Sequence, residues 1–190
     1  MSVSHRYTSA DLELIPAVEG KRYEIIDGDL YVTHAPSLGH QYVCLRMGRA
    51  LDEWNDVADL GTPYGSPGLV FPGDDDVTPD LIWVSREREN AGTDAADHLT
   101  VAPELAIEVL SPGSTNERRD LQLKLKLYSR QGVQEYWIVN WQRREIKVYR
   151  RADQALKLVA TLLDDDRLES PLLPGFSVPI SWFWPRRSRG

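Results

Sequence analysis

Residues 103–140 read PELAIEVLSPGSTNERRDLQLKLKLYSRQGVQEYWIVN, and this stretch decides the fold. The nearly continuous apolar run of Leu105–Leu110 predicts a strand that is covered on both faces. After a turn rich in Pro and Gly, the apolar residues of Leu121–Tyr128 recur with helical spacing and predict an amphipathic helix. Gly132 ends this helix, and Glu135–Asn140 returns as a second apolar strand. The stretch therefore predicts a strand, a helix and a second strand around which the rest of the chain is organised.

Two charged residues interrupt these apolar patterns. Glu108 lies inside the first strand, where a carboxylate is costly unless a cation or hydrogen-bond donors meet it. At roughly 100° per residue, Lys124 falls within the apolar arc of the helix, whereas Lys126 falls on its polar side. We therefore expect Glu108 and Lys124 to meet in a polar cluster at one end of a buried sheet. A structural ion pair is the alternative, because ion pairs also perturb charges without doing chemistry.

Asp80 is a third charge that breaks an apolar pattern. It lies in the predicted strand Val77–Val84, directly after Pro79, whose missing backbone donor suits the start of a strand or a sheet edge. Asp80 alone would be a weak signal. Asp80, Glu108 and Lys124 together, in this order, form a candidate site.

The N-terminal part predicts a short helix and a hairpin. Residues 9–14 can form the helix, because Thr8 and Ser9 are good capping residues. Asp27-Gly28 separates the apolar segments Arg22–Ile26 and Asp29–Thr33, which is a strong signal for a two-residue hairpin.

A longer helix is predicted over residues 38–55, with Ser37 as its cap. Its core-facing stripe consists of His40, Val43, Cys44, Met47, Leu51 and Trp54. A histidine at the start of such a stripe is more often a hydrogen-bonded packing residue than a ligand. Cys44 has the character of a small buried hydrophobe and not of a nucleophile.

The remaining segments predict loops and a second hairpin. Residues 61–73 are rich in Gly and Pro and read as a loop that enters a strand, and Asp74–Asp76 reads as a solvated turn. Arg144–Arg150 and Leu156–Thr161 predict a C-terminal hairpin. Near the end of the chain, Trp182–Trp184 is expected to pack over the domain or to form part of a dimer contact.

Length and composition favour one globular domain over residues 1–190. The net charge of −7 argues against a general nucleic-acid coat protein, although a nuclease with acidic metal ligands remains compatible with it. No apolar run approaches the ~20 residues of a membrane span, and the N-terminus shows no export signal. Because the single cysteine, Cys44, cannot form an intrachain disulfide, a cytoplasmic location without membrane association is expected.

Five blocks of the sequence occur in one order that resembles the bacterial Uma-two family of endonucleases. They are YEIIDGDLY, TPDLIWVS, PELAIEVLSPGST, RRDLQLKLKLY and GVQEYWIVN, and the resemblance runs from about Tyr23 to Tyr149. The Pro-Asp dipeptide, the acidic residue of the next strand and the nearby lysine also look like the PD-(D/E)XK nuclease superfamily. The resemblance implies an α+β fold (α/β mixed) with a restriction-endonuclease-like core. In this fold helices flank a mixed central sheet, with β-hairpin additions at both ends of the chain.

The resemblance also implies a site. The superfamily's usual lysine lies two residues after the acidic residue of the strand, where this chain has Leu110. It therefore implies a lysine displaced to the helix, Lys124, the residue that helical periodicity indicates independently. The family likeness adds Glu24 to the acidic cluster; the alternative for Glu24 is an exposed residue paired across the hairpin.

In the catalytic interpretation, Asp80 and Glu108, with the backbone carbonyl of Val109, hold Mg²⁺ or Mn²⁺, since these ions prefer oxygen ligands. Cysteine and histidine pairs at zinc spacing are absent from the sequence. Lys124 then stabilises developing charge or orients the attacking water. Substrate phosphate would be contacted by Arg118, Arg119 and His40, although the two arginines could equally be solvated residues of a helix surface.

The charged cluster and the resemblance together imply a magnesium-dependent endonuclease that hydrolyses phosphodiester bonds in nucleic acid, in the first instance DNA. The resemblance to nucleases of this class also implies a homodimer, for which the C-terminal aromatic residues offer a surface. Two other classes stay open. One is a nuclease-like binding or regulatory module without activity, which would bind nucleic acid or a protein partner but no divalent metal. The other is a hydrolase that uses paired carboxylates as acid and base on a glycoside or another ester.

Overall fold

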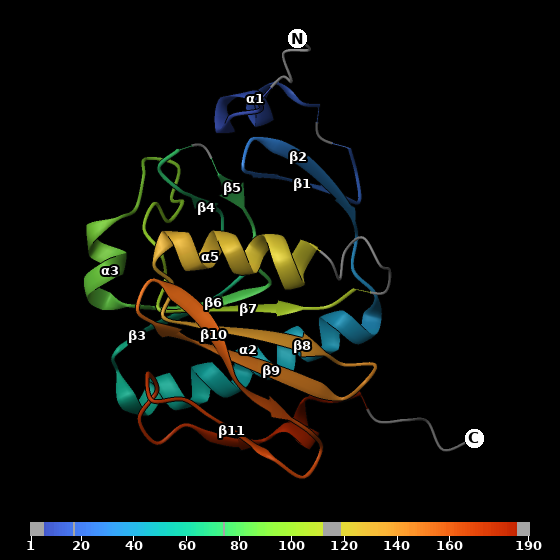
Figure 1. Ribbon diagram of the computed structural model, residues 1–190, viewed down its shortest axis with the longest axis vertical. Helices are drawn as coiled ribbons and strands as arrows, with labels where there is room; N and C mark the ends of the chain where they lie inside the picture. Colours follow the sequence, from blue (N-terminus) through green and yellow to red (C-terminus); the bar gives the residue numbers. More distant parts are fainter. Residues whose placement is uncertain (1–5, 17, 74, 112–118, 186–190) are drawn as a thin grey trace.

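A six-stranded sheet forms the centre of the protein (Figure 1). The computed structural model describes residues 6–16, 18–73, 75–111 and 119–185, without the side chains of residues 119–121. In order across the sheet, the strands are β10 (Ala155–Leu162), β9 (Glu145–Ala152), β8 (Glu135–Asn140), β7 (Leu105–Val109), β6 (Leu81–Ser85) and β3 (Gly61–Gly65). β7 and β8 run parallel and the other neighbours are antiparallel, so the sheet is mixed, as predicted. The predicted C-terminal hairpin supplies β9 and β10 and continues this sheet.

The predicted strand, helix and strand of residues 103–140 are confirmed. Every residue of β7 and β8 is buried, as expected for strands that are covered on both faces. Within the described residues, the connecting helix comprises a π-helical turn, η1 (Arg119–Lys124), followed by α5 (Leu125–Gln131). Gly132 has a φ of 96° and ends α5, and its N–H donates to the carbonyl of Tyr128 at 3.2 Å. π-helical turns occur frequently at functional sites.

A second, four-stranded sheet contains the predicted N-terminal hairpin. Its order is β2 (Asp29–His34), β1 (Lys21–Ile26), β5 (Asp76–Val77) and β4 (Leu69–Val70). At the tip of the hairpin, Asp27 has a φ of 55° and Gly28 a φ of 81°, the two positive values that a type I′ turn requires. Figure 1 shows this sheet beyond α5, on the side away from β9 and β10.

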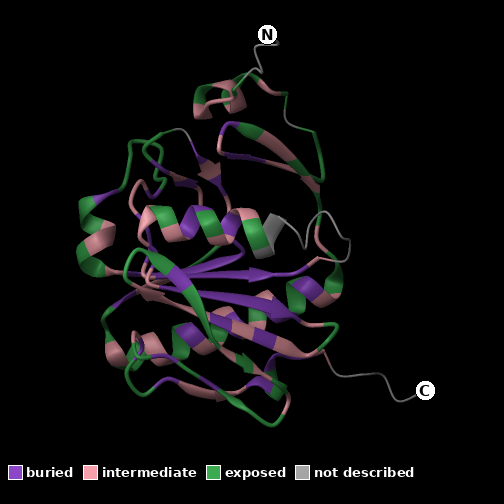
Figure 2. Ribbon diagram, in the orientation of Figure 1, coloured by how far each residue is buried: buried purple, intermediate pink, exposed green. Residues whose placement is uncertain are grey.

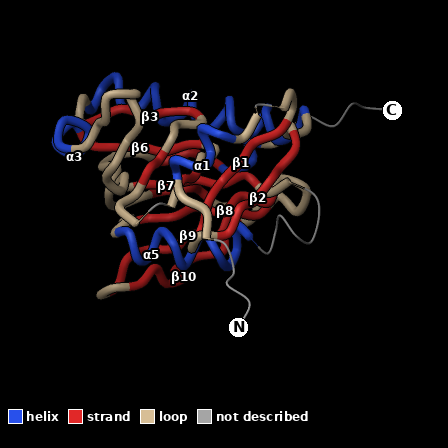
Figure 3. Tube along the Cα trace, turned by 90° about the horizontal axis from the view of Figure 1, so that it is seen from above, coloured by secondary structure: helices blue, strands red, loops and turns tan. Residues whose placement is uncertain are grey.

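Helices cover both faces of the central sheet (Figures 1 and 3). α2 (Leu38–Ala58) packs on one face together with Leu105, Ile107 and Val109 of β7. α5 packs on the other face, with Ala106 of β7. Because side chains alternate along a strand, Glu108 lies on the face of α5. Figure 2 shows that burial is concentrated in these central strands.

Shorter elements complete the described chain. They are α1 (Ser9–Leu14), α3 (Arg86–Ala91), β11 (Arg167–Glu169), β12 (Ser177–Pro179) and the 3₁₀ turn η2 (Ile180–Phe183). Phe183 and Trp184 are buried against the α2 side of the core, as predicted, whereas Trp182 is 60% exposed. No helix within the described ranges has the length and apolar character that crossing a membrane requires.

Two predicted loops are wrong, and both errors have a nonlocal cause. Residues 61–65 form β3, a strand at the edge of the central sheet paired with β6. Pro63 is tolerated there because an edge strand need not donate every backbone N–H. Asp75 does not lie in a solvated turn: it is buried and accepts hydrogen bonds from the N–H of Asp27 at 2.7 Å and from Arg130 at 2.6 Å.

The single strand predicted over Val77–Val84 is divided in the structure. Val77 ends β5 of the small sheet, whereas β6 of the central sheet begins at Leu81. Pro79 and Asp80 form the passage from one sheet to the other. Asp80 therefore lies at the junction of the two sheets.

Candidate active site

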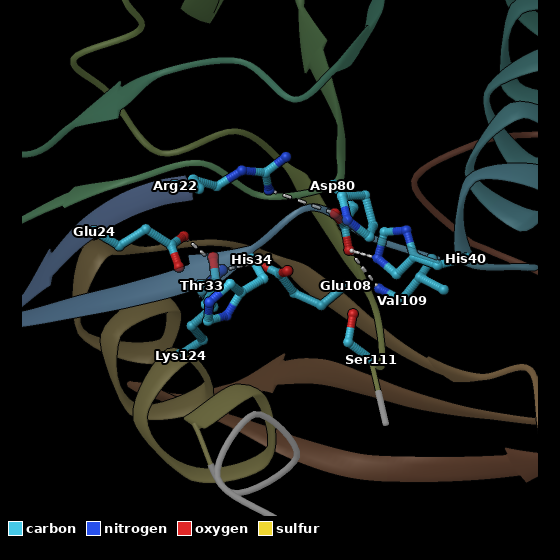
Figure 4. Close-up of a pocket in the computed structure, with 11 residues that line it drawn as sticks. Arg22, Glu24, Thr33, His34, His40, Asp80, Glu108, Val109, Ser111 and Lys124 are labelled. Atoms are coloured by element: carbon cyan, nitrogen blue, oxygen red, sulfur yellow. Dashed lines mark hydrogen bonds and ion pairs between the residues drawn. The ribbon is translucent and has the colours of Figure 1, made fainter. Parts of the chain in front are cut away.

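A small pocket lies where β6 begins, next to Glu108 and Val109 of β7 (Figure 4). Leu81 pairs with Ile107, and the same register one residue further places Asp80 opposite Glu108. The described side chains lining the pocket are Arg22, Glu24, Thr33, His34, Pro36, His40, Asp80, Glu108, Val109, Ser111 and Lys124. Its volume is about 40 Å³, which exceeds the roughly 10–15 Å³ that one water requires.

Asp80 is held on one side by two donors. Its Oδ2 accepts the backbone N–H of Val109 at 2.9 Å and lies 3.0 Å from Nε2 of His40. Burial raises the pKa of Asp80, but the hydrogen bond and charge of His40, the N–H of Val109 and the charge of Lys124 outweigh burial, so the pKa is below its ordinary value. The other oxygen, Oδ1, lies 3.6 Å from Nη1 of Arg22. Asp80 is thus an ionised carboxylate with one oxygen held by the protein core.

Lys124 lies between two buried carboxylates. Its amine is 2.7 Å from Oε1 of Glu108 and 2.8 Å from Oε1 of Glu24, and all three side chains are at most 3% exposed. The hydroxyl of Tyr128 donates to the same Glu108 oxygen at 2.9 Å, and the N–H of Thr78 donates to Glu24 at 3.0 Å. Burial is the main cause that raises the pKa of Tyr128 well above its usual range, which keeps this hydroxyl protonated.

The predicted directions of the two lysines are confirmed. Lys124 is buried, whereas the side chain of Lys126 is 70% exposed. Glu24 is buried in the cluster, so the alternative of an exposed hairpin residue is wrong.

His40 connects Asp80 to α2. Its Nδ1 lies 3.5 Å from the sulfur of Cys44, one turn further along the helix. Burial is the main cause that raises the pKa of Cys44, so its thiol stays protonated beside Nδ1. A hydrogen on Nε2 of His40 is donated to the Asp80 carboxylate, which can only accept.

The polar atoms of His40, Cys44 and Asp80 all lie within 4.8 Å of one another and could hold a metal ion. The two ring nitrogens of His40 face different partners, however, and this arrangement favours a hydrogen-bond chain. His40, predicted to contact substrate, is 3% exposed and forms the wall of the pocket behind Asp80.

Two of the predicted substrate contacts cannot be placed, and one pocket residue was not predicted. Arg118 and the side chain of Arg119 lie outside the described residues. Arg22, which lines the pocket from β1, was not a candidate. Strand alternation could have identified it, because Arg22 and Glu24 are two residues apart and therefore share a face.

Comparison with known proteins shows the family and the fold of the chain. A family model with the description "Uma2: Putative restriction endonuclease" matches residues 9–181. The chain belongs to the Uma2 family. The Uma2 fold described above is also similar to the crystal structure of "a putative nuclease belonging to DUF820" from Anabaena variabilis ATCC 29413, with a TM-score of 0.73 and 18% identity. That similarity covers 93% of this chain and 99% of the other, and it supports the predicted α+β fold. No curated protein matches the chain.

In this Uma2 protein, the lysine beside Glu108 comes from the helical segment and not from the strand. Leu110, which occupies the superfamily's usual lysine position, is buried in the apolar cluster of α5. Lys124 reaches the pocket from η1 and contacts Glu108 directly. An amine supplied by the helix thus lies beside the strand carboxylate although the strand itself carries none.

Proposed function

We propose that this protein is a metal-dependent endonuclease that hydrolyses phosphodiester bonds, with DNA as its substrate. The observation that carries the proposal is the convergence of Asp80, Glu108 and Lys124, from three separate elements, on one pocket. Membership of the Uma2 family supports a nuclease.

The residues present fit Mg²⁺ or Mn²⁺. Asp80, Glu108 and Val109 line one pocket, and two carboxylates with a backbone carbonyl would supply the hard oxygen donors that these ions prefer. When bound, the ion supplies positive charge for the phosphate and lowers the pKa of water. Asp80 suits the role of a metal ligand, because its lowered pKa keeps the carboxylate ionised and because Val109 and His40 hold Oδ2 in place.

Lys124 would stabilise negative charge that develops on the phosphate and would orient the attacking water. A buried donor that is already held in place contributes more than one in water, because it need not reorganise during the reaction. Glu24 and Glu108 hold the amine of Lys124 from two directions. Glu24 is therefore proposed to position the lysine, and Arg118 and Arg119 stay predictions as phosphate contacts.

One observation favours a second candidate, a nuclease-like module without activity. The amine of Lys124 makes close contacts with both Glu24 and Glu108, the arrangement expected of a structural ion cluster. Such a module would bind nucleic acid or a protein partner without cutting and without binding a divalent ion.

Cleavage assays with isosteric variants separate the two functions. Purified protein is incubated with plasmid and oligonucleotides in Mg²⁺, Mn²⁺ or chelator. We expect Asp80→Asn and Glu108→Gln to lower cleavage on the order of 10²-fold or more. Glu135→Gln is the matched control, because Glu135 is an equally buried carboxylate of the central sheet that does not line the pocket. Wild-type cleavage that persists in chelator, or full activity of a folded Asp80→Asn protein, would refute the proposal.

The homodimer is proposed to involve Trp182. This side chain is 60% exposed beside the buried Phe183 and Trp184, and large exposed aromatic residues are typical of interfaces. Sedimentation at several concentrations should show a dimer that Trp182→Ser weakens. A monomer at all concentrations would contradict this part of the proposal.

A further inference from the structure

Arg22 is held far more loosely than the other cation of the pocket. Its guanidinium lies 3.2 Å from the carbonyl of Thr78, 3.5 Å from the hydroxyl of Ser66 and 3.6 Å from Oδ1 of Asp80. Strong hydrogen bonds between charged groups are shorter, about 2.7–2.9 Å, as those of Lys124 are. The side chain of Arg22 is also 33% exposed, whereas that of Lys124 is 1% exposed. Arg22 can therefore exchange its partners at little cost.

The position of Arg22 relates it to the proposed metal ligand. Figure 4 shows Arg22 and His40 approaching Asp80 from opposite sides. His40 and the N–H of Val109 contact Oδ2, and Arg22 faces Oδ1. A divalent cation bound by Oδ1 would lie close to the guanidinium, and the two positive charges would repel each other.

A larger groove meets the pocket at Asp80, and two residues that Arg22 contacts line this groove. This groove has a volume of about 680 Å³ and lies between α2 and the end of β3. Asp80 lines both the pocket and the groove, and Ser66, a partner of Arg22, lines the groove. A nucleic-acid strand that follows the groove to Asp80 would bring a phosphate past Arg22.

We propose that Arg22 is a phosphate-contacting residue that neutralises Asp80 in the metal-free protein and turns to the substrate phosphate when a divalent ion binds. The inference rests on the proposed function. A guanidinium suits this role because its planar fork matches phosphate oxygens in a bidentate manner. Arg22 would thus couple metal binding to substrate binding, because the guanidinium that metal displaces from Asp80 becomes available for phosphate.

The proposal predicts that one substitution of Arg22 strengthens metal binding and weakens oligonucleotide binding. Arg22→Gln removes a positive charge beside Oδ1, and we expect Mn²⁺ to bind about tenfold more tightly. The same variant should bind a DNA oligonucleotide, in the presence of Ca²⁺ and without cleavage, about tenfold more weakly. Arg22→Lys should keep the Mn²⁺ affinity within about threefold of wild type, because the charge remains, and lose part of the oligonucleotide affinity.

Both affinities are measured on the intact chain, Mn²⁺ by calorimetric titration without nucleic acid and the oligonucleotide by fluorescence anisotropy. Arg86→Gln serves as control, because Arg86 is an exposed arginine that pairs with Asp59 and does not line the pocket. If Arg22 were only structural, Arg22→Gln would weaken both affinities or neither, and either outcome would overturn the inference. A wild-type protein that binds neither Mn²⁺ nor oligonucleotide would instead overturn the proposed function.

Discussion

Substitution of Lys124 by Met tests the charge balance of the site. The substitution removes the ammonium group from between Glu24 and Glu108 while it keeps most of the side-chain volume. Both carboxylates lose a partner at 2.7–2.8 Å, and all three side chains are almost fully buried. Breaking a buried ion pair by removal of one partner costs about 3–5 kcal/mol. We therefore expect Lys124→Met to lower the free energy of unfolding by about 3–5 kcal/mol in chelator.

The loss of stability alone does not separate a catalytic lysine from a structural one, because burial makes the lysine necessary in both cases. The response to a divalent ion does separate them. An ion that binds only the folded protein adds about 2.7 kcal/mol at a concentration of 100 Kd. If Asp80 and Glu108 hold Mn²⁺, the stability of Lys124→Met should rise by about this amount. A purely structural cluster predicts no change with Mn²⁺.

Urea denaturation followed by tryptophan fluorescence measures both effects, provided that the dependence on urea is the same for all variants. Lys126→Met is the matched control on the same helix: its amine is exposed and lies 3.5 Å from Asp27, so its loss should cost less than about 0.5 kcal/mol. If Lys124→Met does not fold, Lys124→Met/Glu24→Gln, with one buried charge fewer, should be the more stable protein. A loss below about 1 kcal/mol for Lys124→Met in chelator would refute the reasoning, because breaking a buried pair costs more than this.

Three further predictions concern the surroundings of the site. His40→Leu should weaken Mn²⁺ binding about 10–100-fold in calorimetric titration, whereas His40→Gln keeps a donor for Asp80 and should stay near wild type; equal affinities of the two variants would contradict a positioning role. Burial raises the pKa of Asp27, but the hydrogen bond and charge of Arg130 outweigh burial, so the pKa in the folded protein is lowered. Ionised Asp27 therefore stabilises the folded protein fully at pH values above the pKa of the unfolded chain, about 4. Wild type should be more stable than Asp27→Asn in thermal unfolding by less than about 1 kcal/mol, because the pair is partly exposed. This difference in the free energy of unfolding should vanish as the pH falls through the lowered pKa of Asp27 in the folded protein. A difference that stays constant with pH would contradict the prediction. Gly132→Ala should cost about 1 kcal/mol in urea denaturation, because φ is 96° and no atom lies within 4 Å of an added methyl group; an unchanged midpoint would show that the helix end adapts.

Elements with a local signal were predicted well. The hairpin at Asp27-Gly28 depends on two residues that accept a positive φ, and the structure has both. The inward direction of Lys124 follows from helical spacing, which is a property of neighbouring residues. The π-helical turn at η1 was not predicted, although it did not change the direction of this lysine.

The errors concern residues whose partners are distant in the chain. Pro63 and its neighbours read as a loop because their strand is defined by pairing with β6. Asp75 read as solvated, yet its partner Arg130 lies 55 positions away. The contact between Arg22 and Asp80 also joins distant residues: strand alternation places Arg22 on the face of Glu24, but it does not indicate Asp80.

The sequence by itself determined the strand, helix and strand at the centre, the order of the acidic and basic residues, and the side of the helix on which Lys124 lies. These are short-range features, because each depends on side-chain periodicity and turn chemistry over a few residues. Only the tertiary structure decided that Glu24, Asp80 and Glu108 surround one pocket, that His40 holds Asp80, and that Arg22 lies at Oδ1. The physical reason is that such a site depends on the register and meeting of two sheets, which are set by packing between segments far apart in the chain.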